Sequence, residues 1–136
     1  MRKENSMREI KFRAWDNENK EMLKVQELDF EDTFYGGRLA IRTDQYNDYF
    51  DLEDMILMQF TGLKDKNRKE IYEGDIVKIN VDRACVKWNG KYGYFQLVPI
   101  GDYYFDSDVI GQALEYVEAE VIGNIYDNPE LLEKGE

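Results

Sequence analysis

The side chains best suited to chemistry in this sequence are carboxylates. The chain has no histidine and one cysteine, so general acid–base catalysis would fall to Asp, Glu, Tyr, Lys or that cysteine. The stretch TDQYNDYFDLED concentrates five acids, which are Asp44, Asp48, Asp51, Glu53 and Asp54. Oxygen ligands of this kind bind hard cations, but the stretch lacks the spacing and the glycine of an EF-hand. With 29 acids in 136 residues, neighbouring carboxylates arise by chance. A protein without catalytic activity is therefore expected ahead of a carboxylate-based hydrolase.

Motifs for cofactor chemistry are missing from the sequence. It contains no P-loop, no GxGxxG and no zinc-binding pattern, so we predict no catalytic residue, no cofactor and no metal. Cys85 lies between Ala84 and Val86, and no histidine is present to lower its pKa. A buried, unreactive thiol is the expected state of Cys85.

The net charge of the chain is −11, and it is unevenly distributed. Residues 27–54 carry nine acids and two arginines, and residues 102–136 carry ten acids and one lysine. Such a field repels phosphate, which disfavours nucleic acid as a ligand of the whole surface. The two acidic stretches either keep the protein soluble or present carboxylates to the basic surface of a partner protein.

Two short segments are basic against this background. KDKNRK (64–69) has four positive charges and one negative charge, and two lysines flank the tryptophan of a predicted hairpin. The candidate partner-binding residues are Lys64, Lys66, Arg68, Lys69, Lys87, Trp88 and Lys91. A solvated turn whose charge prevents edge pairing is the alternative interpretation of the 64–69 loop. The same loop could contact phosphate or the acidic surface of a second copy, which predicts a homo-oligomer as one form of the protein.

Aromatic residues are frequent, with ten Tyr, seven Phe and two Trp. Exposed aromatics such as Tyr92, Tyr94 and Phe95, or the run 103–105, could stack on bases of nucleic acid. Aromatic side chains on strands more often form the core and cross-strand pairs. We therefore keep a nucleic-acid-associated protein as the alternative to a protein-interaction module.

The pattern of apolar residues predicts short strands separated by turns. Ile10, Phe12 and Ala14 alternate with polar neighbours, which is typical of a half-buried strand. Further strands are predicted at 22–30, 55–61, 71–72, 76–81, 84–88, 91–98 and 118–125. Asn89-Gly90 predicts a two-residue type I′ turn, and Gly74 and Asp75 predict a bend with a side-chain cap. A short helix is expected from about Ser107, its N-cap, to residue 117. The segment PELLEKGE from Pro129 is expected to form either a single helical turn or a frayed tail.

Six to eight short strands predict a mainly β fold, a small antiparallel barrel or sandwich of SH3-like type with one or two short helices. An α+β fold with a helix near 108–117 is the alternative. Residues 7–136 are expected to form a single domain after a disordered lead-in at 1–6, and 31–54 a variable or mobile insertion. No apolar run approaches the ~20 residues of a membrane span, and MRKENS does not start a signal peptide. These features predict a cytoplasmic protein.

Three blocks carry a resemblance to a known family: REIKFRAWD near the start, QFTGLKDKNRKEIYEGDIVKI in the middle and VIGNIYDNPELL near the end. Their order and spacing resemble the YopX protein family of phages and prophages, over almost the whole chain from Met7. The resemblance implies a phage- or prophage-encoded protein acting in the bacterial cytoplasm. The acidic stretches predict a host or phage protein as its partner. It implies no activity and no catalytic residues, and residues 31–54 contain no motif that matches.

Overall fold

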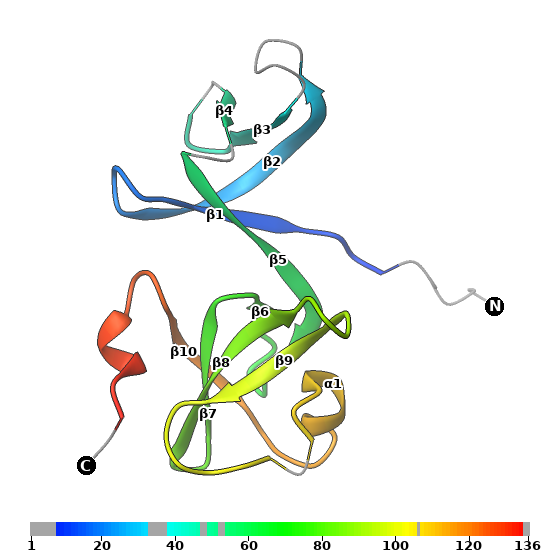
Figure 1. Ribbon diagram of the computed structural model, residues 1–136, viewed down its shortest axis with the longest axis vertical. Coiled ribbons are helices and arrows are strands. Elements are labelled where there is room, and N and C mark those ends of the chain that lie inside the picture. Colours follow the sequence, from blue (N-terminus) through cyan, green and yellow to red (C-terminus); the bar gives the residue numbers. More distant parts are fainter. Residues whose placement is uncertain (1–7, 33–37, 47–48, 52–53, 106, 135–136) are drawn as a thin grey trace, which may run out of the picture.

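The computed structural model describes residues 8–32, 38–46, 49–51, 54–105 and 107–134. Nearly all of its regular structure is antiparallel β (Figure 1). The strands are β1 (Phe12–Asp16), β2 (Glu21–Asp32), β3 (Arg38–Thr43), β4 (Tyr49–Asp51), β5 (Met55–Lys64), β6 (Glu70–Tyr72), β7 (Asp75–Ile79), β8 (Asp82–Asn89), β9 (Tyr94–Pro99) and β10 (Glu120–Asn124). The helices are α1 (Ile110–Ala113) and the 3-10 turn η2 (Pro129–Leu132). The predicted mainly β class is confirmed.

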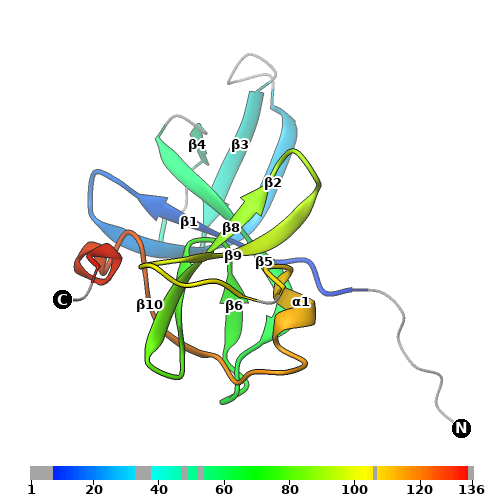
Figure 2. The same cartoon turned by 60° about the horizontal axis from the view of Figure 1, so that its bottom comes forward.

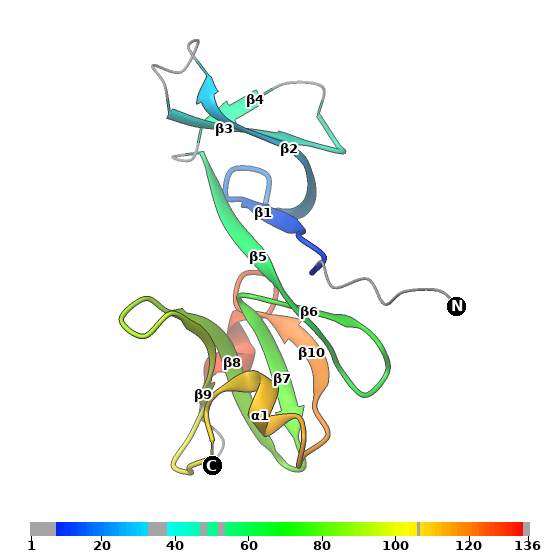
Figure 3. The same cartoon turned by 90° about the vertical axis from the view of Figure 1, so that its right-hand side faces the viewer.

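The strands form two sheets, and the long strand β5 belongs to the first. The first has the order β4-β3-β2-β1-β5-β6, and the second has the order β10-β7-β8-β9. The first half of β5 pairs with β1, and its second half pairs with β6. Figure 1 and Figure 3 both show β5 running from the N-terminal sheet into the part of the molecule that contains β6–β10. We call that part, together with the end of β5 and α1, the C-terminal barrel.

Each part has its own apolar core. Ala14, Leu23, Ile41 and Met55 form the core of the N-terminal sheet. The core of the C-terminal barrel draws on β6, β7, β8, β9 and α1, with Leu63 of β5 packed against it. Figure 2 shows α1 beside these strands at one end of the barrel.

Strand β1 is buried on both faces, where the alternating pattern predicts burial of one face. Ala14 faces the N-terminal core, while Trp15 is also buried and stacks on Tyr126, with ring centroids 5.6 Å apart. Asp16 is buried too and accepts hydrogen bonds from the backbone N–H groups of the following turn. The C-terminal residues cover the second face, and the sequence of β1 alone contains no sign of that contact.

The β8–β9 connection differs from the predicted two-residue type I′ turn. Asn89 pairs with Tyr94, so four residues form the connection. The side-chain oxygen of Asn89 accepts the N–H groups of Lys91 and Tyr92 at 3.0 Å each. Gly93, with φ +73°, takes the left-handed position that the prediction gave to Gly90. The second glycine and the Asn89 side chain together favour the longer turn.

The helix prediction needs correction. Helix α1 is shorter than predicted, and its N-cap is Val109 without a side-chain cap, although the Ser107 hydroxyl accepts the Val109 N–H at 3.3 Å. Within 31–54, strands β3 and β4 extend the N-terminal sheet. Residues 33–37, 47–48 and 52–53 of that segment, and the lead-in 1–6, lie outside the described residues. No helix among the described residues has the length and apolar character needed to cross a membrane.

Candidate functional site

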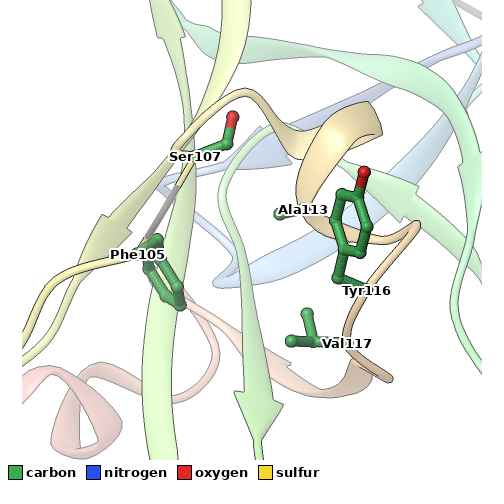
Figure 4. Close-up of a pocket in the computed structure, with 5 residues that line it drawn as sticks. All are labelled: Phe105, Ser107, Ala113, Tyr116 and Val117. Atoms are coloured by element: carbon green, nitrogen blue, oxygen red, sulfur yellow. The ribbon is translucent and has the colours of Figure 1, made fainter.

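An apolar hollow lies beside α1 at the end of the C-terminal barrel. Its volume is about 390 Å3, and its lining comes from two segments. Phe105 and Ser107 lie on one side, and Ala113, Tyr116 and Val117 lie on the other (Figure 4). Tyr116 is 84% exposed, whereas Phe105 and Val117 pack against the barrel core. We call this hollow the helix groove.

A second hollow of about 350 Å3 shares Phe105 and Ser107 with the helix groove. Tyr104, which is 97% exposed, lines it together with residues of β9. Asp108 closes its polar side by accepting hydrogen bonds from Gln96 at 2.8 Å and from the Tyr94 hydroxyl at 3.2 Å. Desolvation and the Asp108 carboxylate raise the pKa of Tyr94, so its hydroxyl remains a neutral donor. The apolar surface thus continues past Phe105 to a polar edge, where Asp108 accepts the hydrogen bonds of Gln96 and Tyr94.

The surroundings of the helix groove are acidic. The stretch 102–120 contains six Asp or Glu residues and no Lys or Arg. Among its described acids, Asp102, Glu115 and Glu118 are exposed. A negative field around an apolar hollow favours a positively charged partner and repels an anionic one. The arrangement can hold an apolar side chain while carboxylates contact a cationic neighbour.

The basic loop 64–69 is exposed except for its one acid, Asp65, and that acid organises the loop. Asp65 is buried, and it accepts the N–H groups of Asn67 at 2.8 Å, Lys69 at 2.9 Å and Val121 at 2.9 Å. Burial by itself would raise the pKa of Asp65, but the three backbone donors outweigh it and hold the pKa below its usual range. The Lys66 N–H also donates to the Ala119 carbonyl. The loop is therefore bonded to β10 through Asp65, while its cations and Asn67 are exposed to water.

The structure separates the candidate partner-binding residues into two groups. Lys64, Arg68 and Lys69 are exposed, and Lys66 lies 3.4 Å from Glu120. Figure 3 shows the loop after β5 and the β8–β9 hairpin on opposite sides of the C-terminal barrel. The two basic segments therefore do not form one continuous patch.

The second group lies on the β8–β9 hairpin. Lys87 and Lys91 are exposed, and the Lys91 ammonium lies 5.2 Å from the centre of the Tyr92 ring. Trp88 is 50% exposed and contacts Phe95 edge-on across the strand pair, with ring centroids 5.0 Å apart. Of the aromatics that could stack on bases, Tyr92 and Tyr104 are exposed, whereas Phe95 and Phe105 pack against the core.

A buried ion pair joins the two parts of the molecule, and the sequence patterns did not identify it. The Arg13 guanidinium on β1 donates to Asp75 at 2.8 Å and to the Glu73 carbonyl at 3.1 Å. It also lies over the Tyr72 ring, 4.8 Å from its centre. The predicted bend with Asp75 as its cap is confirmed, because Asp75 accepts the Tyr72 N–H at 2.7 Å and Gly74 has φ +89°. In the sequence, only the block QFTGLKDKNRKEIYEGDIVKI, which includes Glu73–Asp75, drew attention to the segment that binds Arg13.

Among the described residues, no group of three or more His, Cys, Asp or Glu side chains is placed to hold a metal ion. Cys85 is buried as predicted, and burial raises the pKa of its thiol, which disfavours the thiolate. The described carboxylates instead act as hydrogen-bond acceptors in turns, as Asp16 and Asp65 do.

Comparison with known proteins agrees with the three sequence blocks. The YopX protein family matches residues 11–133, nearly the whole chain. The fold is also similar to the crystal structure of protein EF1440 from Enterococcus faecalis, with a TM-score of 0.68 and 32% sequence identity, over 93% of this chain and 100% of that one. Among curated proteins, none matches the chain significantly. With the family matched from β1 to η2, this chain belongs to the YopX protein family.

Proposed function

We propose that this protein is a phage- or prophage-encoded interaction module without catalytic activity that acts in the bacterial cytoplasm. In this proposal the helix groove binds a segment of a partner protein, from host or phage, that carries an apolar anchor flanked by Lys or Arg. The observation that supports it most is an open apolar hollow of about 390 Å3 in a stretch with six acids and no base. Exposed apolar surface rimmed by charge is typical of protein-interaction sites.

The chemistry of the groove supports a peptide segment as the ligand. Tyr116 lines the helix groove and Tyr104 lines the adjoining hollow, and both are exposed. Tyrosine is enriched at interfaces because its ring is apolar and its hydroxyl can hydrogen-bond to water or to a partner. Glu115 and Glu118, next to Tyr116 and Val117 in the chain, would contribute to the rate of encounter and to partner choice more than to affinity. The apolar anchor would supply most of the affinity by burying surface against Phe105 and Val117.

The proposal is tested by cross-linking at the groove in lysate of the host bacterium. A photoreactive phenylalanine analogue replaces Tyr116, and the same analogue replaces Tyr92 on the distant hairpin as the matched control. We expect a protein cross-linked from position 116 and not from position 92. Its yield should fall in the background Glu115→Gln with Glu118→Gln and should fall with added salt, because exposed charge pairs are screened. Cross-links that are the same from both positions, or unchanged by the two glutamines, would contradict the proposal.

A second copy of the chain is a further partner that we propose, because it carries complementary charge. Lys64, Arg68 and Lys69 are exposed on one loop of a molecule whose α1 region is acidic. Light scattering of the purified protein over a concentration series decides this point. A mass of 16.2 kDa at every concentration would exclude self-association and leave the heterologous partner as the proposal.

A further inference from the structure

A second groove lies where β5 of the N-terminal sheet meets the C-terminal barrel. Its volume is about 270 Å3, and we call it the junction groove; its lining includes Ile56, Met58, Glu73, Lys87, Trp88 and Tyr126. This volume falls just under the roughly 300–1,000 Å3 of most small-molecule sites. The junction groove therefore suits one ring system better than a whole cofactor.

Two large apolar side chains are left exposed at this groove. Trp88 is 50% exposed and Ile56 is 40% exposed. Trp88 is braced edge-on against Phe95, and its indole lies close to Gly90, so its position is set by the hairpin. A braced, half-exposed indole is suited to stacking on a flat ligand.

The segment that carries Trp88 is basic, unlike the chain as a whole. Residues 83–101 contain Arg83, Lys87 and Lys91 and no acid. Lys87 lines the groove, and Lys91 lies at the turn of the same hairpin. At physiological salt the Debye length is about 8 Å, so acidic residues farther away are largely screened from an anion bound here.

One acid inside the groove provides a polar contact. Glu73 lines it, and its Oε1 accepts the Gln59 N–H at 3.2 Å, which holds the carboxylate in place. A carboxylate accepts hydrogen bonds from amino groups such as N4 of cytosine. Aromatic surface, an acceptor and Lys87 thus line one base-sized hollow, and Lys91 lies at the turn of the same hairpin.

We propose that the junction groove binds a nucleotide, with the base stacked on Trp88, its amino group donating to Glu73, and its phosphate contacted by Lys87 and Lys91. The chemistry is shared by a single-stranded nucleic acid and a free nucleotide. Only an unpaired base can enter, because a base within a duplex has both faces stacked. This site is separate from the helix groove, and it does not depend on the function proposed there.

The test uses the full-length protein with a short fluorescein-labelled oligodeoxycytidylate, followed by anisotropy at about 50 mM salt, where phosphate contacts are strong. We expect saturable binding, weakened about 5- to 150-fold by Trp88→Ala, the range found for loss of one stacked base. Trp88→Phe retains a stacking ring and should keep most of the affinity. Lys87→Ala should reduce the steepness of the salt dependence by about 0.7 in log–log slope, the contribution of one phosphate contact on a single strand. Tyr116→Ala, in the helix groove, serves as the control and should change nothing.

Unlabelled competitors separate the two sources of the ligand. Displacement by cytidine monophosphate as effective as by the oligomer identifies a free nucleotide, and much stronger displacement by the oligomer identifies a single strand; either result supports the site. The proposal is overturned if no binding saturates below about 0.1 mM, the weak end of non-specific affinity. It is also overturned if duplex DNA binds as well as the single strand, or if Trp88→Ala binds like the native protein. In those cases a protein partner would be the remaining candidate ligand of the junction groove.

Discussion

At the scale of single residues, one carboxylate determines the conformation of the basic loop. Asp65 accepts three backbone N–H groups, two from its own turn and one from Val121 of β10. It is 7% exposed, so these donors have no ready replacement from water. Hydrogen bonds to a charged group contribute about 1.5–3 kcal/mol each at most sites. The loop therefore depends on Asp65 more than on the four cations that dominate its sequence.

Replacement of this carboxylate by an amide gives a prediction with a pH signature. Asp65→Asn turns one acceptor into a donor, and we expect the free energy of unfolding at neutral pH to fall by roughly 1.5–3 kcal/mol. The folded pKa of Asp65 lies below its usual value of 3.8, so its contribution is complete above that pH and is lost as pH falls through the folded pKa. Urea denaturation at several pH values should show the difference between the two proteins shrinking in acid. Asp102→Asn, at a side chain 95% exposed, is the control. A difference that stays constant with pH would contradict this account.

At the scale of elements, the β8–β9 hairpin presents Trp88 and Lys91 through a specific turn. Four residues connect the strands, and Gly93 is the one that adopts a left-handed conformation. A Cβ at Gly93 would meet nothing within 4 Å, so the backbone angle is the whole cost of a side chain there. Gly90 has no such angle, and a Cβ there would meet the Trp88 ring at an ordinary 3.9 Å.

The two glycines therefore make a matched pair of substitutions. Gly93→Ala should lower the free energy of unfolding by about 1–2 kcal/mol, the cost of a left-handed residue with a Cβ. Gly90→Ala should change it by less than about 0.5 kcal/mol, as surface substitutions usually do. Chemical denaturation of the two variants measures both values. If Gly90→Ala lowered the free energy of unfolding more than Gly93→Ala, the result would support the two-residue type I′ turn predicted from Asn89-Gly90.

At the scale of the whole molecule, contacts between β1 and the barrel join the two cores. Arg13 reaches Asp75 across 62 positions of sequence, and Trp15 stacks on Tyr126. Lys11 hydrogen-bonds to Glu70 of β6 in the same region. The Arg13 and Asp75 side chains are only 15% and 3% exposed. Removing one partner of such a pair leaves a buried charge, which is costly, whereas an exposed pair contributes little.

Arg13→Met tests this junction against a less buried pair of the same type. We expect it to lower the free energy of unfolding by roughly 3–5 kcal/mol, because Asp75 remains buried without its cation. Arg42→Met breaks the half-buried Arg42–Glu27 pair, whose side chains are 31% and 42% exposed, and should cost about 1 kcal/mol or less. Urea denaturation of both variants, with identical buffers, measures the contrast. Similar small losses for the two would show that the junction is held by β5 alone.

Much of the fold follows from local patterns that act over a few residues. Alternation and β-branched or aromatic residues located β1, β2, β5, β7 and β10, and the single helical turn at Pro129 is confirmed. The buried state of Cys85 followed from its apolar neighbours. The candidate sites could be predicted only in part. The acidity of 102–136 and the basic character of Lys87–Lys91 are visible in the sequence, but the hollows beside them are not.

The sequence by itself determined the class of fold, the family and the places where charge accumulates, because these depend on composition and on side chains close together along the chain. Tertiary structure decided which residues lie inside. Asp65 is buried in a loop whose sequence predicts a solvated turn. Trp15 is buried on a strand face that the alternating pattern predicts to be exposed. Both depend on partners at least 50 positions away, Val121 for Asp65 and Tyr126 for Trp15. Whether a polar or aromatic side chain faces water is set by such distant segments, and no local pattern records their approach.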